Sequence, residues 1–584
     1  MQTVKSELMN NLPRPEYPRP QFERDTWQNL NGEWSYTFDS GKSGMDQGRE
    51  LFRSHGFPNR IIVPFCPESK LSGVQHTDFI EALWYHRELQ VPASWMGKRI
   101  LLHFGAVDYE SEVFLDGQSV GLHFGGASAF TWDITRFVKP DSTHHLIVRV
   151  ADELRSGGQQ PCGKQSSQFK SAVCHYTRTT GIWQTVWLEA VDPGGLRDVQ
   201  IIPDLDGGRL IFVPAFQTES QGRRFKVTAS TGETVTAPAV GGVPVSLPLR
   251  ELRPWSPASP YLYDLEFSVI DAGGRELDQV HSYAGLRKIH IEGNRVFLNN
   301  EPIYQRLVLD QGFYPDGIWT APTDAALRRD IELSQQAGFN GARLHQKVFE
   351  PRFHYWADRL GYLTWGEAPS WGCDPNSIVG ARNFLSEWAE IIQRDRNHPS
   401  LITWTPWNET GYRSVLRQHA RVHRDSYRLC KAIDPTRPVN DTSGYIHVET
   451  DLWTVHTYEQ DPAQLQAQLT PPPLVFRNNP DQEPEYAGQP YLVDEFGGIK
   501  WIPEDRRAFA DNSWGYGDAP RSLEEFYQRL DGQVRALVSL AHISGFCYTQ
   551  LTDVEQEQNG IYNYDRTPKF DMQRIAGIFR KDGP

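Results

Sequence analysis

The sequence predicts a multidomain protein in which two β-sandwiches precede a (β/α)8 TIM barrel. Three observations lead to this prediction. The chain has 584 residues, which is several times the length of an average domain. Up to about residue 290, its apolar residues form short runs separated by turn residues. Beyond that point, strand-like and helix-like segments alternate, as they do in a parallel sheet covered by helices.

The first domain is predicted at residues 1–193 as a jelly-roll-like β-sandwich. Short runs such as Arg99–Phe104 and His145–Val150 have the length and composition of strands. A hairpin is predicted at Asp116–Gly117, because this dipeptide readily adopts the positive φ angles of a type I′ turn. A second all-β stretch, residues 194–290, has the size of one immunoglobulin-like sandwich.

Residues 291–584 are predicted to form the barrel. Thr323 is the expected N-cap of a helix whose apolar positions have helical spacing, and Gly338 is expected just past its end. Apolar strand segments recur through the rest of the chain, at 339–344, 362–366, 401–404, 452–456, 491–493 and 545–549. About 290 residues of such alternation fit one barrel better than two smaller folds.

Composition excludes several classes of function. The chain has 59 basic and 73 acidic residues, a net charge of −14, so a protein that binds nucleic acid through phosphates is not expected. No apolar run approaches the roughly 20 residues of a membrane helix, so no membrane partner is expected. The first residues lack the apolar core of a signal peptide, which predicts a cytoplasmic protein.

The six cysteines are scattered and form no paired metal-ligand motif. Neither a disulfide framework nor a structural zinc site is expected, and no cofactor or catalytic metal is predicted. Buried free thiols are the simpler interpretation.

Two carboxylates end apolar strands of the predicted barrel, where barrel enzymes carry their reactive residues. Glu409 closes the segment Leu401–Glu409, and Glu495 closes Pro490–Glu495. Two carboxylates that face one cleft can have their pKa values pushed apart, so that one acts as an acid and the other as a nucleophile. This arrangement serves glycoside hydrolysis with retention of configuration, although either residue alone can also be a solvated strand end.

The residues around Glu409 resemble a known signature. Asn397-His-Pro-Ser, three further positions, Trp404 and then Asn408-Glu409 resemble the acid/base motif of glycoside hydrolase family 2, with Thr405 where that family usually has Gly or Ser. The resemblance spans nearly the whole chain: Leu30-Asn-Gly-Glu-Trp resembles the start of the family's sugar-binding sandwich. The short, three-domain branch of the family is the expected match.

The resemblance implies roles for four residues. Glu409 would be the general acid/base and Glu495 the nucleophile. Asn408 would bind the sugar 2-hydroxyl, and Tyr458 would orient the nucleophile. Tyr458 can alternatively be a packing residue of the barrel.

Other positions depart from the family pattern. Arg343 is followed by His345 one place earlier than usual, so His345 is expected either to contact the sugar or to have a structural role. Tyr548 stands at the expected position of a tryptophan that forms the pocket floor. Asp553 and Glu555, in the final loop, are expected either to bind sugar hydroxyls or to face solvent.

The predicted function is an exo-acting retaining β-glycosidase that removes a neutral terminal sugar. β-Glucuronidases of the family carry Asn-x-Lys in the final loop, where this chain has Asn559-Gly-Ile, so the expected cation is missing. β-Galactosidase ranks first, then α-L-arabinosidase, then β-mannosidase. A catalytically inactive carbohydrate-binding protein is the alternative from another class.

The partners expected are a carbohydrate substrate and, as is usual in the family, further copies of the chain in a homo-oligomer. Two glycine- and glutamine-rich stretches of the first sandwich, Gln118–Ala127 and Cys162–Ser171, are candidates for a loop that closes the pocket. The sequence does not decide between them.

Overall fold

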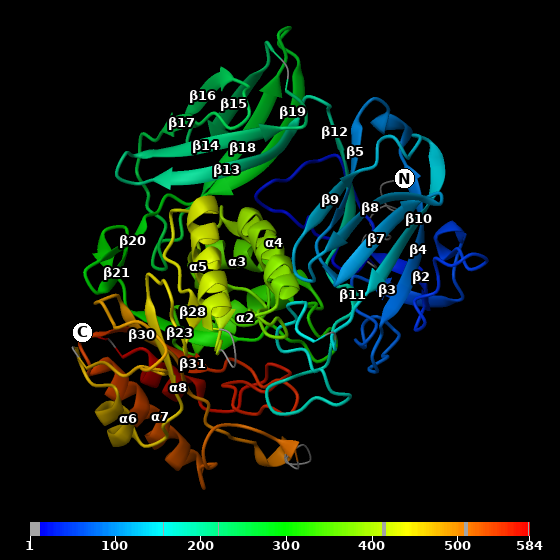
Figure 1. Ribbon diagram of the computed structural model, residues 1–584. Coiled ribbons are helices and arrows are strands. Elements are labelled where there is room, and N and C mark those ends of the chain that lie inside the picture. Colours follow the sequence, from blue (N-terminus) through cyan, green and yellow to red (C-terminus); the bar gives the residue numbers. More distant parts are fainter. Residues whose placement is uncertain are drawn as a thin grey trace.

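A computed structural model describes residues 12–155, 157–219, 221–411, 416–472, 474–506, 512–581 and 583. Its chain forms two β-sandwiches and a barrel, as the sequence predicts (Figure 1). The first sandwich is blue to cyan, the second lies above the barrel in green, and the barrel runs from green to red.

The first sandwich packs a six-stranded antiparallel sheet, in the order β3-β2-β4-β10-β7-β8, against a four-stranded sheet, β1-β12-β5-β9. Its core residues include Trp34, Leu102 and Val148. The hairpin predicted at Asp116–Gly117 joins β7 to β8, and both residues have positive φ. The bounds are β1 Trp27–Asn29, β2 Gly32–Phe38, β3 Asn59–Val63, β4 Ala82–Val91, β5 Arg99–Phe104, β6 Val107–Asp108, β7 Glu110–Leu115, β8 Gln118–Phe124, β9 Phe130–Asp133, β10 Ser142–Ala151, β11 Gly181–Ile182 and β12 Val186–Val191, with short 3-10 helices at Leu51–Arg53 and Ala93–Trp95.

The second sandwich consists of a three-stranded sheet, β13-β14-β17, and a four-stranded sheet, β16-β15-β18-β19. Alternate residues of its strands face the core, as the buried Phe225 and Val227 of β15 illustrate. The bounds are β13 Leu196–Asp204, β14 Arg209–Phe216, β15 Arg224–Ala229, β16 Thr234–Pro238, β17 Val245–Pro248, β18 Tyr263–Ile270 and β19 Glu276–Ala284. A small sheet of β20 Ile289–Glu292, β21 Arg295–Leu298 and β22 Glu301–Pro302 leads into the barrel.

The barrel strands form a parallel sheet in the order β26-β25-β24-β23-β31-β30-β29. The short strand β28, which pairs with β27, fills the position between β26 and β29. The strands are β23 Gln305–Asp310, β24 Gly341–Leu344, β25 Leu363–Glu367, β26 Leu401–Thr405, β27 Trp407–Asn408, β28 Thr442–Ser443, β29 Trp453–Thr457, β30 Tyr491–Gly497 and β31 Ile543–Thr549. The helices are α2 Asp324–Gln336, α3 Pro351–Leu360, α4 Ile378–Asp395, α5 Leu416–Ile433, α6 Pro462–Gln468, α7 Leu523–Val538 and α8 Met572–Phe579.

The predicted helix boundaries hold for α2. The Thr323 hydroxyl accepts a hydrogen bond from the Ala326 amide, and Gly338 just beyond the helix has a φ of 102°. None of the helices among the described residues is long and apolar enough to cross a membrane.

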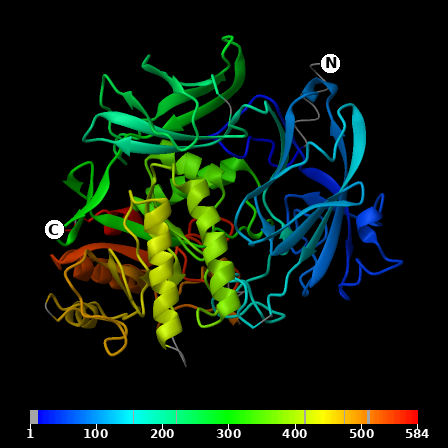
Figure 2. The ribbon, with the colours of Figure 1, turned by 45° about the horizontal axis from the view of Figure 1, so that its top comes forward.

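Buried contacts hold both sandwiches to the barrel. Trp255 of the second sandwich donates from its indole to the Asp358 carbonyl of α3, at 2.7 Å. The first sandwich packs against α4, where the Ala127 amide donates to Glu387 at 2.7 Å. Figure 2 shows α4 and α5 running side by side along the barrel, with α4 on the side of the first sandwich.

Candidate active site

The two predicted carboxylates meet at the carboxyl ends of the barrel strands. Glu409 follows β27, and Glu495 lies near the end of β30. One oxygen of Glu409, one oxygen of Glu495 and one ring nitrogen of His456 lie within 4.8 Å of one another. The structure therefore brings both carboxylates to one site and adds a histidine that the sequence reasoning did not include.

Glu495 is buried and accepts two hydrogen bonds. The Tyr458 hydroxyl donates to it at 2.5 Å and Arg343 Nη2 donates at 2.7 Å. Burial alone raises its pKa, but the charges of His456, Arg343 and Lys164 outweigh that effect and hold the pKa at about 2. Glu495 is therefore ionised at neutral pH, which is the state that a nucleophile requires.

His456 lies on β29 between the two carboxylates. Its Nδ1 donates to Glu409 Oε1 at 2.7 Å, and its Nε2 lies 3.0 Å from the Ser443 hydroxyl. Burial lowers its pKa, but the charges of Glu495 and Asp494 outweigh burial and raise the pKa to about 10. A protonated imidazole has no lone pair for a metal ion, so this cluster is better suited to holding a proton than a cation.

Replacing His456 with Gln should destabilise the protein in a pH-dependent way. Because the folded-state pKa lies above the ordinary value of 6.5, the stabilisation by His456 is complete below about pH 6.5 and is lost as pH rises through 10. We expect a loss of about 3 kcal/mol in the free energy of unfolding near pH 6, and a smaller loss near pH 10. Urea unfolding at both pH values measures it. His281→Gln, at an exposed position, should change neither value, and an equal loss for His456→Gln at both pH values would contradict the assignment.

Arg343 organises the floor of the site. Its guanidinium is fully buried and donates to Glu367, to the Asp494 carbonyl and, at 2.9 Å, to the Asn408 side-chain oxygen. Its three nitrogens are all engaged, so Arg343 positions other groups and has no free nitrogen for a ligand.

Asn408 is left with one buried donor. Its oxygen accepts from Arg343, which turns its Nδ2 the other way, and that nitrogen has no hydrogen-bond partner among the described residues. Buried amide donors are almost always paired in folded proteins. An orphaned donor beside Glu409 and Glu495 is therefore evidence that a ligand group completes the site.

His345 lies in the same buried network. Its Nδ1 accepts from Arg343 Nη2 at 2.7 Å. Burial, and then the charges of Lys164 and Arg343, hold its pKa well below the ordinary value, so the ring is neutral.

Tyr548 is not at the site, contrary to the expectation from sequence. Its ring packs against Phe496 and Phe579 in the apolar layer between the strands and the helices. The next residue, Thr549, faces inward, and its hydroxyl lies 3.1 Å from that of Tyr458. Side chains alternate along a strand, so an offset of one residue moves the ring to the other face.

Asp553 and Glu555 both have structural partners. Asp553 is buried, accepts from Lys569 at 2.7 Å and accepts from the Gly560 amide at 2.9 Å. Glu555 accepts from the Thr177 amide of the first sandwich at 3.1 Å. Asp553 was expected either to bind sugar hydroxyls or to face solvent. It does neither, because its carboxylate is hydrogen-bonded inside the final loop.

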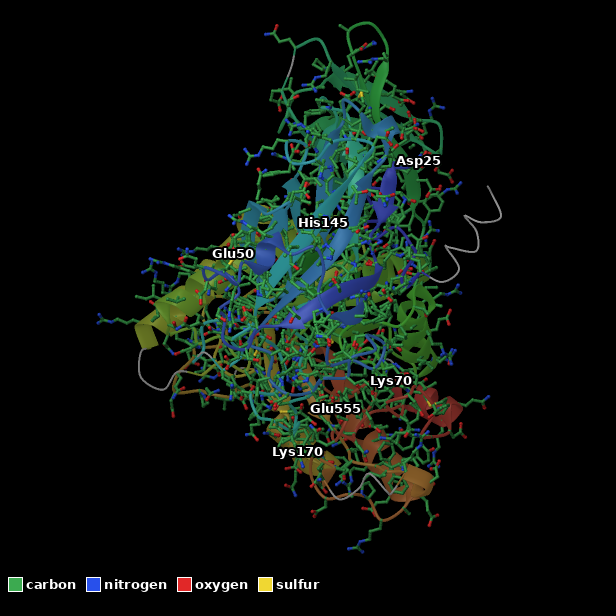
Figure 3. All side chains as sticks on the ribbon, turned by 90° about the vertical axis from the view of Figure 1, so that its right-hand side faces the viewer. Asp25, Glu50, Lys70, His145, Lys170 and Glu555 are labelled. Carbon is green, nitrogen blue, oxygen red and sulfur yellow. The ribbon has the colours of Figure 1, made fainter. Side chains whose placement is uncertain are left out.

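The first sandwich reaches the site through the loop between β10 and β11, here called the sandwich loop (157–180). Its Cys162 amide donates to the Trp371 carbonyl at 2.8 Å, and its Tyr176 hydroxyl donates to Glu557. The other candidate, Gln118–Ala127, contacts α4 instead. In Figure 3, Lys170 of this loop and Glu555 lie toward the same end of the molecule, away from Asp25 and His145.

Further residues complete the walls. The Tyr516 ring stacks on Tyr458, with centroids 3.3 Å apart, and the Trp371 indole donates to the Asn408 carbonyl at 3.2 Å. A cavity of about 520 Å³ opens beside Glu409, between residues 370–376 and 408–411. Of the residues that sequence reasoning missed, His456 had a signal in the sequence, because it lies two positions before Tyr458, at the end of the same predicted strand segment.

The sequence matches models of a known protein family. Family models match three segments: "Glycosyl hydrolases family 2, sugar binding domain" at residues 70–188, "Glycosyl hydrolases family 2" at 210–287, and "Glycosyl hydrolases family 2, TIM barrel domain" at 289–580. The three segments follow the two sandwiches and the barrel of the structure.

Individual relatives are distant. A β-glucuronidase of Paenibacillus borealis is 23% identical over 72% of this chain and 74% of its own length. A β-galactosidase of Thermoanaerobacter pseudethanolicus is 24% identical over 82% of this chain and 64% of its own length. The solved structure of a Ruminococcus gnavus β-glucuronidase with D-glucuronic acid has a TM-score of 0.79 at 20% identity, covering 97% of this chain and 100% of that one, which supports the shared fold.

The three matched segments cover most of the described chain in the order that the family requires. The protein belongs to glycoside hydrolase family 2, whose members are retaining glycosidases.

Proposed function

We propose that this protein is an exo-acting retaining β-glycosidase with Glu495 as nucleophile and Glu409 as general acid/base. The spacing of the two carboxylates carries the proposal. Retaining enzymes hold their carboxyl groups roughly 5 Å apart, whereas inverting enzymes leave about 6.5–9.5 Å for a water molecule. Oxygens of Glu409 and Glu495 within 4.8 Å of each other fit the retaining spacing.

The first step joins the sugar to the enzyme. Ionised Glu495, oriented by Tyr458 and Arg343, attacks the anomeric carbon while the bond to the leaving oxygen breaks. Glu409 gives its proton to that oxygen. His456 Nδ1, at 2.7 Å from Glu409, holds this carboxyl in place and serves as a positioning residue.

The second step releases the sugar. Glu409, now ionised, takes a proton from water, whose oxygen attacks the anomeric carbon and frees Glu495. The unpaired Nδ2 of Asn408 fits a hydrogen bond to the sugar 2-hydroxyl, a contact that strengthens in the transition state. Both carboxylates and this orphaned donor favour a hydrolase over an inactive carbohydrate-binding protein.

The identity of the sugar stays a prediction. The relatives include proteins named β-glucuronidase and proteins named β-galactosidase, at similar distances. The order from the sequence remains β-galactosidase, then α-L-arabinosidase, then β-mannosidase. The argument for a neutral sugar rests on one cation that is missing from the final loop.

A panel of aryl glycosides tests the proposal. We expect hydrolysis of at least one glycoside of galactose, glucose, mannose, arabinose or glucuronic acid. Proton NMR of the first product should show the same anomeric configuration as the substrate, because two displacements restore it. The free sugar alone, followed over the same minutes, controls for spontaneous mutarotation. A first product of opposite configuration would rule out the double displacement.

A further inference from the structure

Lys164 is a cation that the first sandwich contributes to the pocket of the barrel. Its neighbour Gly163 donates from its amide to the Pro369 carbonyl at 3.0 Å, and the Lys164 carbonyl accepts from the Tyr176 amide at 2.8 Å. A Cβ at Gly163 would lie only 2.1 Å from the Gln346 carbonyl oxygen, so glycine permits this close approach of loop and barrel. The loop therefore fixes the backbone of Lys164 directly above the strand ends.

The Lys164 side chain is buried yet unpaired. Lys164 is 5% exposed, and across the described ranges its ammonium has neither a hydrogen bond nor an ion pair. The ammonium lies over the faces of two aromatic rings, 5.4 Å from the centroid of Trp371 and 6.0 Å from that of Tyr176. An ammonium has three donors, and here none of them meets an acceptor of the described residues, so they are available to a ligand group.

The charge of the ammonium interacts with those of the predicted catalytic carboxylates. Burial lowers the pKa of Lys164, but Glu557, Glu495 and Glu409 lie close enough to raise it overall, so the side chain is charged. The same charge helps to lower the pKa of Glu495. Its contact with the Trp371 ring, whose indole donates to the Asn408 carbonyl, places Lys164 beside the predicted sugar site.

The other cations around the pocket are already occupied. Arg343 uses its nitrogens on Glu367, Asn408 and Glu495. Lys569, next to the final loop, donates to Asp553 and to two backbone carbonyls. Lys164 is the cation left for a substrate among those of the described site, and it belongs to a domain that the final-loop argument did not consider.

We propose that Lys164 binds an anionic group, a carboxylate or a sulfate ester, on the terminal sugar, and that the enzyme prefers acidic glycosides. This inference rests on the proposed retaining glycosidase activity and specifies its substrate class. An acidic sugar takes the place of the neutral sugar that was predicted because the final loop lacks a lysine. In this proposal the sandwich loop supplies the lysine that the final loop lacks. Charged hydrogen bonds are the strongest that a lysine forms, so the ion pair determines specificity.

The test compares matched acidic and neutral substrates. Aryl β-glucuronide and β-galacturonide are compared with β-glucoside and β-galactoside, and 6-sulfo-β-galactoside forms a separate arm. We expect kcat/KM for one acidic substrate to exceed that of its neutral counterpart. Whether a uronide or the sulfate ester is cleaved identifies the anionic group.

Lys164→Met should lower kcat/KM on the preferred acidic substrate about 100-fold and on its neutral counterpart less than about threefold, since only the charged contact is lost. Lys170→Met, an exposed lysine of the same loop, is the matched control and should leave both values unchanged. The melting temperature of Lys164→Met checks that the variant folds, and it should fall only slightly, because nearby carboxylates favour the charge of Lys164 in the folded protein.

Two results would overturn the inference: a wild-type enzyme that cleaves neutral substrates as well as acidic ones, or an equal loss on both in Lys164→Met. If Lys164→Met does not fold, inhibition of the wild type decides instead, and free uronic acid or sugar sulfate must inhibit more strongly than galactose. Absence of turnover on every wild-type substrate would contradict the proposed glycosidase itself, so the two failures are distinguishable.

Discussion

Glu495→Gln should abolish glycoside hydrolysis, with a loss in kcat on the order of 10⁴-fold or more. The amide is nearly the same size as the carboxylate but cannot form the covalent bond to the anomeric carbon. The partners of Glu495 at this position, Tyr458 and Arg343, can still hold the side chain, so substrate binding should survive. Steady-state kinetics on the best aryl glycoside measures the loss, and calorimetric titration measures the retained binding.

The matched control is Glu524→Gln on α7. Glu524 is 58% exposed and pairs with Arg574 at the surface, so the same chemical change there should leave kcat within about twofold. Wild-type turnover by Glu495→Gln would remove Glu495 from the mechanism, whatever sugar the enzyme takes.

Glu409→Gln should affect substrates according to their leaving groups. An alkyl or sugar leaving group needs a proton as its bond breaks, so we expect a loss of about 10³-fold in kcat/KM. Dinitrophenolate leaves without a proton, so kcat/KM for a dinitrophenyl glycoside should fall far less. The alkaline limb of the pH profile, which reports the acid, should disappear from the variant.

Azide extends this test. In the second step water needs Glu409 as a base, whereas azide does not, so azide should speed turnover of dinitrophenyl substrate by Glu409→Gln. Glu485→Gln, an 89% exposed carboxylate, should show neither the leaving-group effect nor the rescue. Equal losses for both leaving groups would show that Glu409 is not the proton donor.

Much of the architecture could be predicted from local sequence. The hairpin at Asp116–Gly117 and the capped helix after Thr323 follow from backbone preferences that a few residues express. Glu409 and Glu495 could be assigned to one cleft because parallel strands end at the same edge of a barrel. These features depend on local chemistry and on one topological rule.

The inward-facing residue at the end of β31 could not be predicted, for a physical reason. Every residue of β31 is buried, so no alternation of polar and apolar residues shows which face is which. Tyr548 and Thr549 are then indistinguishable by pattern. The tertiary structure distinguishes them, because Tyr548 packs against Phe496 and against Phe579 of α8.

Lys164 could not be predicted either. It lies on a loop of another domain, and its place in the pocket depends on how that domain docks against Pro369 and Trp371. Burial and lack of a partner are properties of the assembled structure. Nothing in the residues around Lys164 distinguishes it from an exposed lysine such as Lys170.

If Lys164 binds the substrate as proposed, the docking of the sandwich loop divides substrate recognition and bond cleavage between two domains of the chain. The proposed catalytic residues lie at the ends of barrel strands, whereas Lys164 and Tyr176 belong to a domain with its own core. Substitutions in that loop can alter which sugars are accepted while the strand ends stay intact. Exchange of the first sandwich between related enzymes should therefore transfer substrate preference from one enzyme to the other. New substrate specificities can then arise in this architecture without changes to the barrel.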